Sequence, residues 1–298
     1  MVYHIPALLK ESIDGLNIQP DGIYVDVTFG GGGHSREILN RLKTGKLVAF
    51  DQDEDAGLNI PTDEKFLFLN QNFRFLRNNL RFNNIESIDG LIADLGVSFH
   101  QFDVPERGFS FRQDAPLDMR MSQNGGVTAA HLLEITEESE LADIFYKYGE
   151  LSDSRRIARE IVLKRTSTPL KTVNDLIGAV SKLAPFRQEH KFYAKLFQAL
   201  RIAVNHEIDY LQEMLEQALS VLNTGGRLVV ISYHSLEDRV VKNFMKSGNF
   251  SGEEKKDFFG NTETPFRLIN RKGTTPGDEE IAVNNRARSA RLRIAEKI

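Results

Sequence analysis

A run of four glycines follows the first apolar segment of the chain. Residues 23–27 (Ile-Tyr-Val-Asp-Val) predict a short β-strand, and the run from Gly30 to Gly33 separates it from a helix expected over residues 35–42. Glycine lets the backbone approach a ligand closely, and the first turn of a helix offers N–H groups without helical partners. A tight turn alone needs fewer glycines. The run therefore predicts a loop that binds a nucleotide-like ligand.

Two acids stand at the ends of later expected strands. Asp51 follows residues 47–50, 21 positions after Gly30, and Asp94 ends the run that begins at Ile88. Because the carboxyl ends of parallel strands line the ligand crevice of an α/β sheet, both carboxylates are candidates for the site. Asp51 is placed to accept both hydroxyls of a ribose, and Asp94 to hold a cofactor amine or accept protons from a substrate amine. The structural alternatives are a strand-end acid for Asp51 and a cap on the following segment for Asp94.

The glycine spacing leaves two cofactors open. A dinucleotide fingerprint, G-x-G-x-x-G, that starts at Gly30 needs a glycine at the position of Ser35, so the fingerprint is incomplete. A ribose-binding acid at Asp51 serves either a nicotinamide dinucleotide or S-adenosylmethionine. The incomplete fingerprint counts against a nicotinamide-dependent oxidoreductase without excluding it, so both cofactors stay open at this point.

His234 and Ser235 follow a further expected strand, residues 228–232. His234 is the second candidate catalytic residue after Asp94. Ser235 with Asp238 fits a helix-capping box, which is the structural explanation for that serine. His34 and His234 are too far apart in sequence to argue a metal site, so no metal is expected.

The elements that position these residues predict one α/β sheet with a helical insertion. Alternating strands and helices favour parallel βαβ units. Residues 96–126 predict a long loop, and residues 127–190 predict helices without strands. A further helix is expected from about Phe197 to Gly225-Gly226, and a late edge strand over residues 291–295. The chain is thus predicted to form an α/β domain of residues 1–105 and 200–298 with an inserted helical domain of residues 106–199.

Composition limits the class of protein. A hydrophobic share of 41% in 298 residues is enough for a core. No apolar run approaches 18 residues, so no membrane span is expected, and the segment Met1–Pro6 lacks the pattern of a secretory signal. The chain has no cysteine, which excludes disulfides and thiolate metal sites and is consistent with a cytoplasmic location.

Charge is distributed unevenly along the chain. The net charge is -4, yet residues 155–201 hold eleven basic and three acidic residues, whereas the first hundred residues hold nine basic and fourteen acidic ones. A local basic excess is typical of a surface that binds a phosphate backbone, or of an ordinary solvated helix face. Charge alone favours the solvated face somewhat.

Six motifs, in order along almost the whole chain, resemble those of the bacterial 16S rRNA cytidine N4-methyltransferases. The segments are Thr28–Ser35, Asp94–Ser98, Glu106–Phe111, Pro116–Met121, Ser232–Arg239 and Arg286–Ala290. The resemblance implies a Rossmann-like methyltransferase sheet with an inserted helical domain. It also implies that the partner is 16S rRNA within the 30S subunit, near the decoding centre, and that the protein does not act at a membrane. Whether the protein forms a homodimer is left open.

The resemblance further implies roles for individual residues. The residues that would hold S-adenosylmethionine are Gly31, Gly32, Gly33, His34, Asp51, Phe73, Asp94 and Gln101. The target cytidine must be single-stranded or flipped out of its helix to reach the pocket. Arg107 and Phe109 lie in the long loop, where an aromatic ring could stack on that base or anchor the loop. The basic excess of residues 155–201, rather than the resemblance, makes Arg155, Arg156 and Arg159 the expected contacts to RNA. An assembly factor that binds RNA without turnover is the non-enzymatic alternative.

Overall fold

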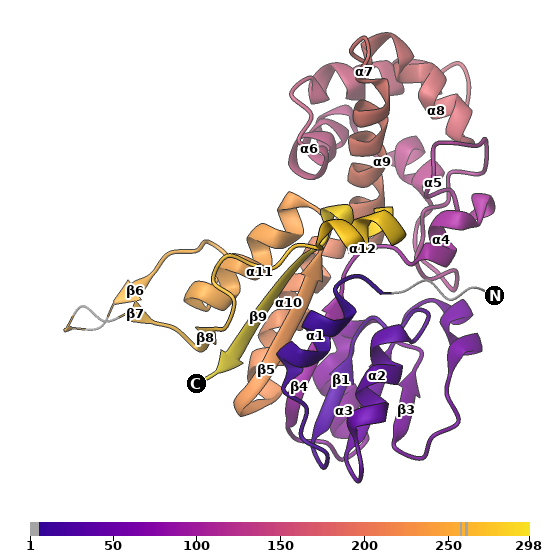
Figure 1. Ribbon diagram of the computed structural model, residues 1–298. Coiled ribbons are helices and arrows are strands. Elements are labelled where there is room, and N and C mark those ends of the chain that lie inside the picture. The colour runs from indigo at the N-terminus through magenta and orange to yellow at the C-terminus, as the bar shows by residue number, and fades with distance from the viewer. Residues whose placement is uncertain (1–5, 257, 260–261) are drawn as a thin grey trace. The chain divides into compact units, whose positions relative to one another are not determined.

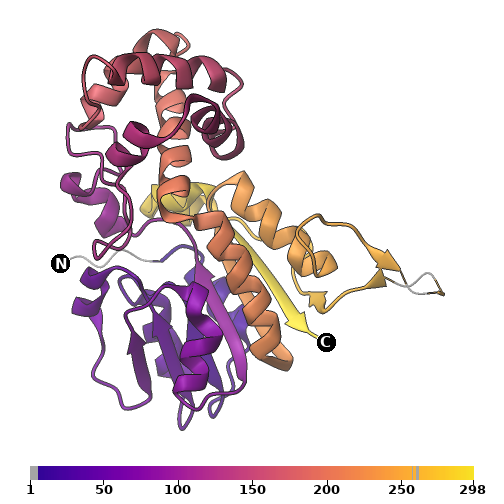
Figure 2. The same cartoon turned by 180° about the vertical axis from the view of Figure 1, so that it is seen from behind.

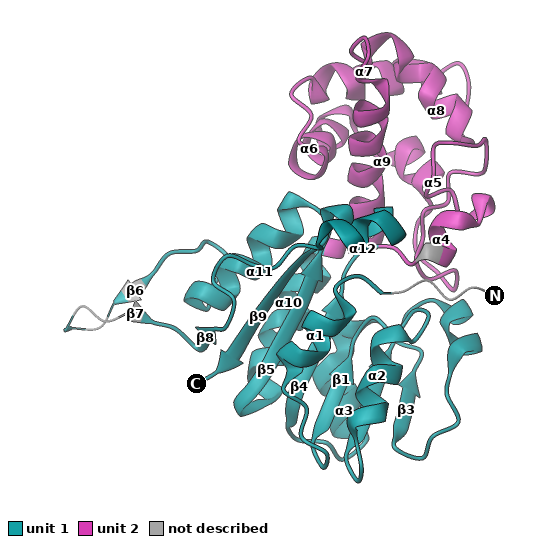
Figure 3. Ribbon diagram, viewed as in Figure 1, with its two compact units in different colours: residues 1–96, 208–298 teal, residues 97–207 magenta. Residues whose placement is uncertain are grey.

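The computed structural model describes residues 6–256, 258–259 and 262–298, and it divides the chain into two compact units (Figures 1 and 3). The first comprises the chain up to Gly96 together with Ile208–Ile298, and the second comprises Val97–Glu207. Residues 1–5, which carry most of the amino-terminal segment considered above, lie outside the described residues. No helix among the described residues has both the length and the apolar character needed to span a bilayer.

The first unit is built on a seven-stranded sheet in the order β3-β2-β1-β4-β5-β9-β8. The pairs β1–β2, β2–β3, β1–β4 and β4–β5 are parallel, whereas β9 pairs antiparallel with β5 and β8. The α/β prediction is confirmed. The strands are β1 (Ile23–Asp26), β2 (Lys46–Phe50), β3 (Phe66–Leu69), β4 (Ile88–Asp94), β5 (Leu222–Ser232), β8 (Phe266–Leu268) and β9 (Arg291–Lys297), and a separate hairpin pairs β6 (Lys255–Lys256) with β7 (Thr262–Glu263).

Alternating residues of the central strands supply a core on each face of this sheet. Leu228 and Val230 of β5 join the core under α10, whereas Val229 and Ile231 join the core under α1 and α2. Figure 1 shows α1 and α2 over one face, and Figure 2 shows α10 over the other. The helices of this unit are α1 (Leu9–Leu16), α2 (Gly33–Arg41), α3 (Leu76–Phe82), α10 (Glu207–Val221), α11 (Ser235–Ser247) and α12 (Asp278–Val283), with short 3-10 helices η1 (Glu54–Asn59), η2 (Phe73–Phe75) and η5 (Asn285–Ser289).

Two predictions about the later part of the chain are wrong. Strand β9 is not at the edge, because the short β8 pairs with its far side; three residues, Phe-Arg-Leu, carry too little alternation to be found in the sequence. The helix expected to run on to Gly225-Gly226 ends at Val221, and the glycine pair lies within β5. The apolar series from Phe197 is also divided between two helices, because His206 adopts a left-handed conformation with φ of 51°.

The second unit is helical, as expected for the insertion, and has one core of its own. Its boundaries differ from the predicted residues 106 and 199, which both fall inside it. The unit includes α4 within the segment expected to be a loop, and α9 runs unbroken to Asn205, whose side-chain amide donates to the carbonyl of Met119. Its helices are α4 (Phe99–Asp103), η3 (Pro105–Arg107), α5 (Ala129–Ile135), α6 (Glu138–Gly149), α7 (Ser154–Arg165), α8 (Val173–Val180), η4 (Ser181–Leu183) and α9 (Glu189–Asn205).

Candidate functional site

The carboxyl edge of the parallel strands gathers the candidate residues of the first unit. The glycine run follows β1, Asp51 follows β2, Phe73 follows β3 in η2, Asp94 ends β4, and His234 follows β5. Since these five strands run parallel, their carboxyl ends meet at one edge, where α/β proteins bind ligands. Residues separated by more than 200 positions in the sequence are therefore parts of one surface.

The glycine loop is shaped by left-handed backbone and by one buried acid. Gly30 and Gly32 have φ of 49° and 72°, and a Cβ on Gly32 would lie 2.9 Å from the Phe29 ring. Asp26 accepts hydrogen bonds from the backbone N–H of Thr28 at 3.0 Å and from Ser35 Oγ at 2.7 Å, so it fixes both ends of the loop. Burial raises the pKa of Asp26 to about 6. Sequence analysis missed this acid; its signal was a carboxylate inside an apolar strand just before the glycines.

Gly31 gives the loop an open face. Its Cα is exposed, and a Cβ placed there would meet no atom within 4 Å. The turn itself therefore does not require glycine at this position. A ligand can approach the backbone closely at Gly31, because the residue is exposed and no side chain fills the space beside it.

Asp51 connects the glycine loop to β2. Its carboxylate accepts the backbone N–H of Gly30 at 2.7 Å and that of Asp53 at 2.9 Å. Burial raises the pKa of Asp51 to about 6, although these two hydrogen bonds act in the opposite direction. A carboxylate oxygen can accept more than one hydrogen bond, so Asp51 can still receive hydroxyl donors. Donors of that kind would lower its pKa again.

Phe73 begins η2 and is held near this acid by its neighbour. Asn72 caps η2 by accepting from the backbone N–H of Arg74, and its amide donates to Gln52 Oε1 at 2.6 Å. The residue before Phe73 is thus bonded to the residue after Asp51. The Phe73 side chain is partly buried against the sheet core.

Asp94 is partly buried at this edge, and several side chains contact it. Tyr233 Oη donates to Asp94 Oδ1 at 2.8 Å, His34 Nδ1 lies 3.9 Å from Asp94 Oδ2, and the Asp94 N–H donates to Thr28 Oγ1 at 2.6 Å. Burial raises the pKa of Asp94 to about 7; the Tyr233 hydrogen bond lowers it and the charges of Asp26 and Glu237 raise it. Tyr233 was not predicted, because a tyrosine directly after a strand has the same pattern as an ordinary core residue, and its contact with Asp94 comes from a different strand.

His34 is a neutral neighbour of this carboxylate. The side chain is buried in the first turn of α2, and burial lowers the pKa of its imidazole to about 4. Its Nε2 is buried and has no hydrogen-bond partner among the described residues. A buried polar atom without a partner is costly, so it indicates a group that a ligand can satisfy.

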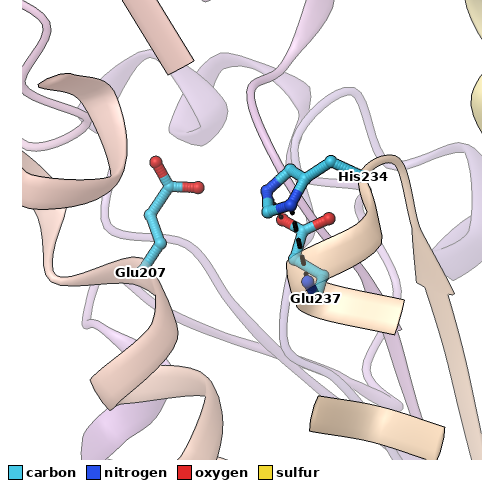
Figure 4. A group of neighbouring side chains, drawn as sticks. All are labelled: Glu207, His234 and Glu237. Atoms are coloured by element: carbon cyan, nitrogen blue, oxygen red, sulfur yellow. Dashed lines mark hydrogen bonds and ion pairs between the residues drawn. The ribbon is translucent and has the colours of Figure 1, made fainter. Parts of the chain in front are cut away.

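His234 is placed by the structure as a helix cap. Its Nδ1 accepts from the backbone N–H of Glu237 at 3.4 Å, and its Nε2 lies 3.1 Å from Glu237 Oε1 (Figure 4). The predicted capping box of Ser235 with Asp238 is wrong, because His234 is the N-cap of α11 and Asp238 instead binds Arg293 Nε and Nη2 at 2.6 and 2.9 Å. These contacts give His234 a structural role as the cap of α11.

The remaining candidates lie in the second unit. Gln101 is buried and completes a capping box with Ser98 at the start of α4. Arg107 donates to the carbonyls of Arg120 and Met121, and Phe109 is part of the core, with exposed fractions of 3% and 5%. Both therefore fit the structural alternative, anchoring of the loop.

The three arginines at residues 155, 156 and 159 differ from Arg107, because all of them are exposed on α7. Their exposure is compatible with contact to a polyanion and equally with a solvated helix face.

Comparison with known proteins identifies the family. The chain matches the MraW methylase family over residues 1–298. The chain belongs to this family. It is 57% identical over 296 residues to the ribosomal RNA small subunit methyltransferase H of a Bacteroides fragilis strain, covering 99% of this chain and 97% of that protein. Proteins of the same name from Flavobacterium johnsoniae and Cytophaga hutchinsonii are 56% and 53% identical, over 100% and 99% of this chain and 99% and 100% of theirs.

Proposed function

We propose that this protein transfers a methyl group from S-adenosylmethionine to small-subunit ribosomal RNA, and that the acceptor is N4 of a cytidine in 16S rRNA. The single observation that carries the proposal is the edge formed by the glycine loop, Asp51 and Asp94 in a chain of the MraW methylase family. The relatives named above are small-subunit rRNA methyltransferases. The choice of cytidine and of its N4 rests on the motif resemblance alone.

The residues at the edge fit S-adenosylmethionine. The open face at Gly31 can admit the cofactor beside the backbone, and Asp51 can accept ribose hydroxyls while it holds Gly30. The unpartnered Nε2 of His34 offers a further polar contact. Phe73, placed next to the Asn72–Gln52 bond, completes the proposed set within the first unit. Gln101 is proposed as a cofactor ligand on the motif resemblance alone.

The chemistry that the cofactor supplies is an electrophilic methyl group on a sulfonium, which needs no metal. The exocyclic amine of cytidine is a poor nucleophile, because its lone pair is delocalised into the ring. Alignment of reactants can contribute about 7–11 kcal/mol to lowering a barrier. The chain's own residues therefore act mainly by positioning the amine and by giving its hydrogens an acceptor.

Asp94 is the proposed acceptor. A carboxyl group with a pKa of about 7 is partly ionised at neutral pH and can take the proton that the amine loses when nitrogen forms its bond to carbon. Tyr233 occupies one carboxylate oxygen and so fixes the direction of the other. His34, neutral because of its lowered pKa, adds no positive charge beside it.

The partner of the reaction is expected to be 16S rRNA within the 30S subunit, in the cytoplasm. We propose that Arg155, Arg156 and Arg159 contact its phosphates, since they are exposed on α7 and belong to residues 155–201, where eleven basic residues stand against three acidic ones. A homodimer is compatible with this proposal but is not needed for it.

The deciding experiment is methyl transfer by the purified protein. Small subunits from cells that lack the enzyme are incubated with S-adenosylmethionine, and the RNA is digested and analysed by mass spectrometry. We expect one modified cytidine and no reaction with NADH as the added cofactor. Tight binding to the subunit without incorporation of a methyl group would support the assembly factor instead.

A further inference from the structure

A cavity next to Tyr233 is lined by three cations and by serine hydroxyls that the reaction above does not use. Its volume is about 410 Å³. The residues around it are Ser232, Tyr233, His234, Ser235, Asp238, Arg239, Lys242, Ser289 and Arg291. All of them belong to the first unit: they lie at the end of β5 and directly after it, on α11, at the end of η5 and at the start of β9. The space exceeds the roughly 30 Å³ share of a single water molecule many times, so it admits a solvated group.

The positive side chains approach the cavity from two elements. Arg239 and Lys242 are three residues apart on α11, and Ser235 precedes Arg239 by four, so the three lie on one face of the helix. Arg291 comes from the beginning of β9. The chain therefore brings three cations together from segments that are about 50 residues apart.

The acid among the residues that line the cavity, Asp238, is shared between two arginines. Asp238 accepts two hydrogen bonds from Arg293, at 2.6 and 2.9 Å, and lies 3.8 Å from Arg291 Nη1. Arg293 has an exposed side-chain fraction of 8% and does not line the cavity. The residues that line the cavity thus carry three positive side chains against one carboxylate, and the shorter contacts of that carboxylate are to Arg293, so the lining has a net positive charge.

Tyr233 connects the cavity to the reacting groups. It lines the cavity, and its hydroxyl donates to Asp94 at 2.8 Å. An anion held in the cavity would thus be separated from the proposed acceptor carboxylate by the Tyr233 side chain. In a nucleic acid, the anionic groups nearest to a base are the phosphates of the same and the adjoining nucleotide.

We propose that this cavity binds a backbone phosphate of the substrate RNA next to the nucleotide that is methylated. Arg239, Lys242 and Arg291 supply the charge, and the exposed hydroxyls of Ser235 and Ser289 can donate to phosphate oxygens. The inference rests on the proposed function, since it takes RNA as the substrate. Binding of this phosphate would fix the position of the nucleotide along the RNA strand, so that its base reaches Asp94.

The experiment compares single substitutions of two cavity cations with one matched control. Lys242→Ala and Arg291→Ala each remove a positive charge from the cavity. The control, Arg81→Ala, removes a positive charge from the exposed end of α3, and that helix leads to the opposite edge of the sheet. For each cavity variant we expect KM for 30S subunits to rise about five- to tenfold. The slope of log affinity against log salt should fall by roughly 0.7, the contribution of one phosphate contact on a single strand. Lys242→Arg should keep most of the wild-type behaviour, and Arg81→Ala all of it.

A chemical probe separates a phosphate contact from a loss of structure. An RNA fragment that contains the mapped target receives one uncharged methylphosphonate on either side of that nucleotide. We expect one of the two replacements to weaken wild-type binding as much as Lys242→Ala does, and to have little further effect in that variant. Additive losses at both positions would overturn the proposal.

Two further measurements distinguish the possible failures. If the cavity variants weaken S-adenosylmethionine binding in calorimetry and leave the RNA salt slope unchanged, the cavity holds the carboxylate of the cofactor and the inference is wrong. RNA binding is also measured by filter retention without turnover. A wild-type protein that binds RNA with the expected variant effects but transfers no methyl group would refute the proposed function and leave the phosphate site standing.

Discussion

Replacing Tyr233 with phenylalanine tests whether Asp94 is the proton acceptor. The substitution removes the one hydroxyl that donates to Asp94 Oδ1, at 2.8 Å, and keeps the ring that lines the neighbouring cavity. That hydrogen bond stabilises the ionised carboxylate and lowers the pKa of Asp94 from the value that burial alone would give. In Tyr233→Phe the pKa of Asp94 must therefore rise.

The size of the shift follows from the energy of the bond. A hydrogen bond to a charged group contributes about 1.5–3 kcal/mol, and one pKa unit corresponds to about 1.36 kcal/mol. The pKa of Asp94 should rise by about 1–2 units. Since the acceptor works in its ionised form, activity appears as pH increases through this pKa, so the acidic limb of the rate profile should move to higher pH by the same amount. At pH values above the new pKa the rate should approach that of the wild type.

The assay is single-turnover methyl transfer to 30S subunits with both substrates saturating. The pH range, from about 5.5 to about 9.5, brackets the expected pKa values of Asp94. Tyr24→Phe serves as the control, because it also removes a phenol from the first unit, where the hydroxyl accepts from the backbone N–H of Gln19. Its profile should coincide with that of the wild type. If the profile of Tyr233→Phe also coincides with it, or is reduced equally at every pH, Asp94 is not the titrating acceptor and the reasoning is refuted.

Three other predictions concern the cofactor, the acceptor and the RNA. Asp51→Ala should weaken S-adenosylmethionine binding in calorimetry about ten- to a hundredfold, the value of a charged hydrogen bond; unchanged affinity would remove Asp51 from the cofactor site. Asp94→Asn should reduce the methylation rate more than it reduces RNA affinity, whereas a parallel loss of cofactor affinity and rate would make Asp94 a cofactor ligand only. Replacing Arg155, Arg156 and Arg159 together with glutamate should weaken binding to 30S subunits and flatten its salt dependence without changing cofactor affinity. Wild-type methylation by that triple variant across a salt series would show an ordinary solvated helix face.

The sequence was sufficient for features that depend on local pattern. Alternating strands and helices identified the α/β sheet, and the glycine run and the strand-end acids were correctly expected at one edge of it, because parallel strands place their carboxyl ends together. Motif resemblance indicated the family over the full chain, which the comparisons confirm. Each of these signals is carried by neighbouring residues or by the order of segments.

Features that depend on contacts between distant segments were decided only by the tertiary structure. Tyr233 and Asp94 are 139 positions apart, and the hydrogen bond between them follows from the pairing of β4 with β5. The raised pKa of Asp94 is likewise caused by burial, which no spacing reveals. Polar residues of one type take different roles according to their surroundings: Arg107 is buried against backbone carbonyls, whereas Arg155 is exposed on α7.

Element boundaries failed for the same reason. The left-handed conformation of His206 ends one helix in a continuous apolar series, and the pairing of Phe266–Leu268 turns an expected edge strand into an inner one. Histidine is tolerated inside helices, so the residue type at position 206 does not predict that a helix ends there. A strand of three residues is too short to show an alternating pattern in the sequence. Local propensity is worth less than about 1 kcal/mol per residue, so packing against distant segments decides where such elements begin and end.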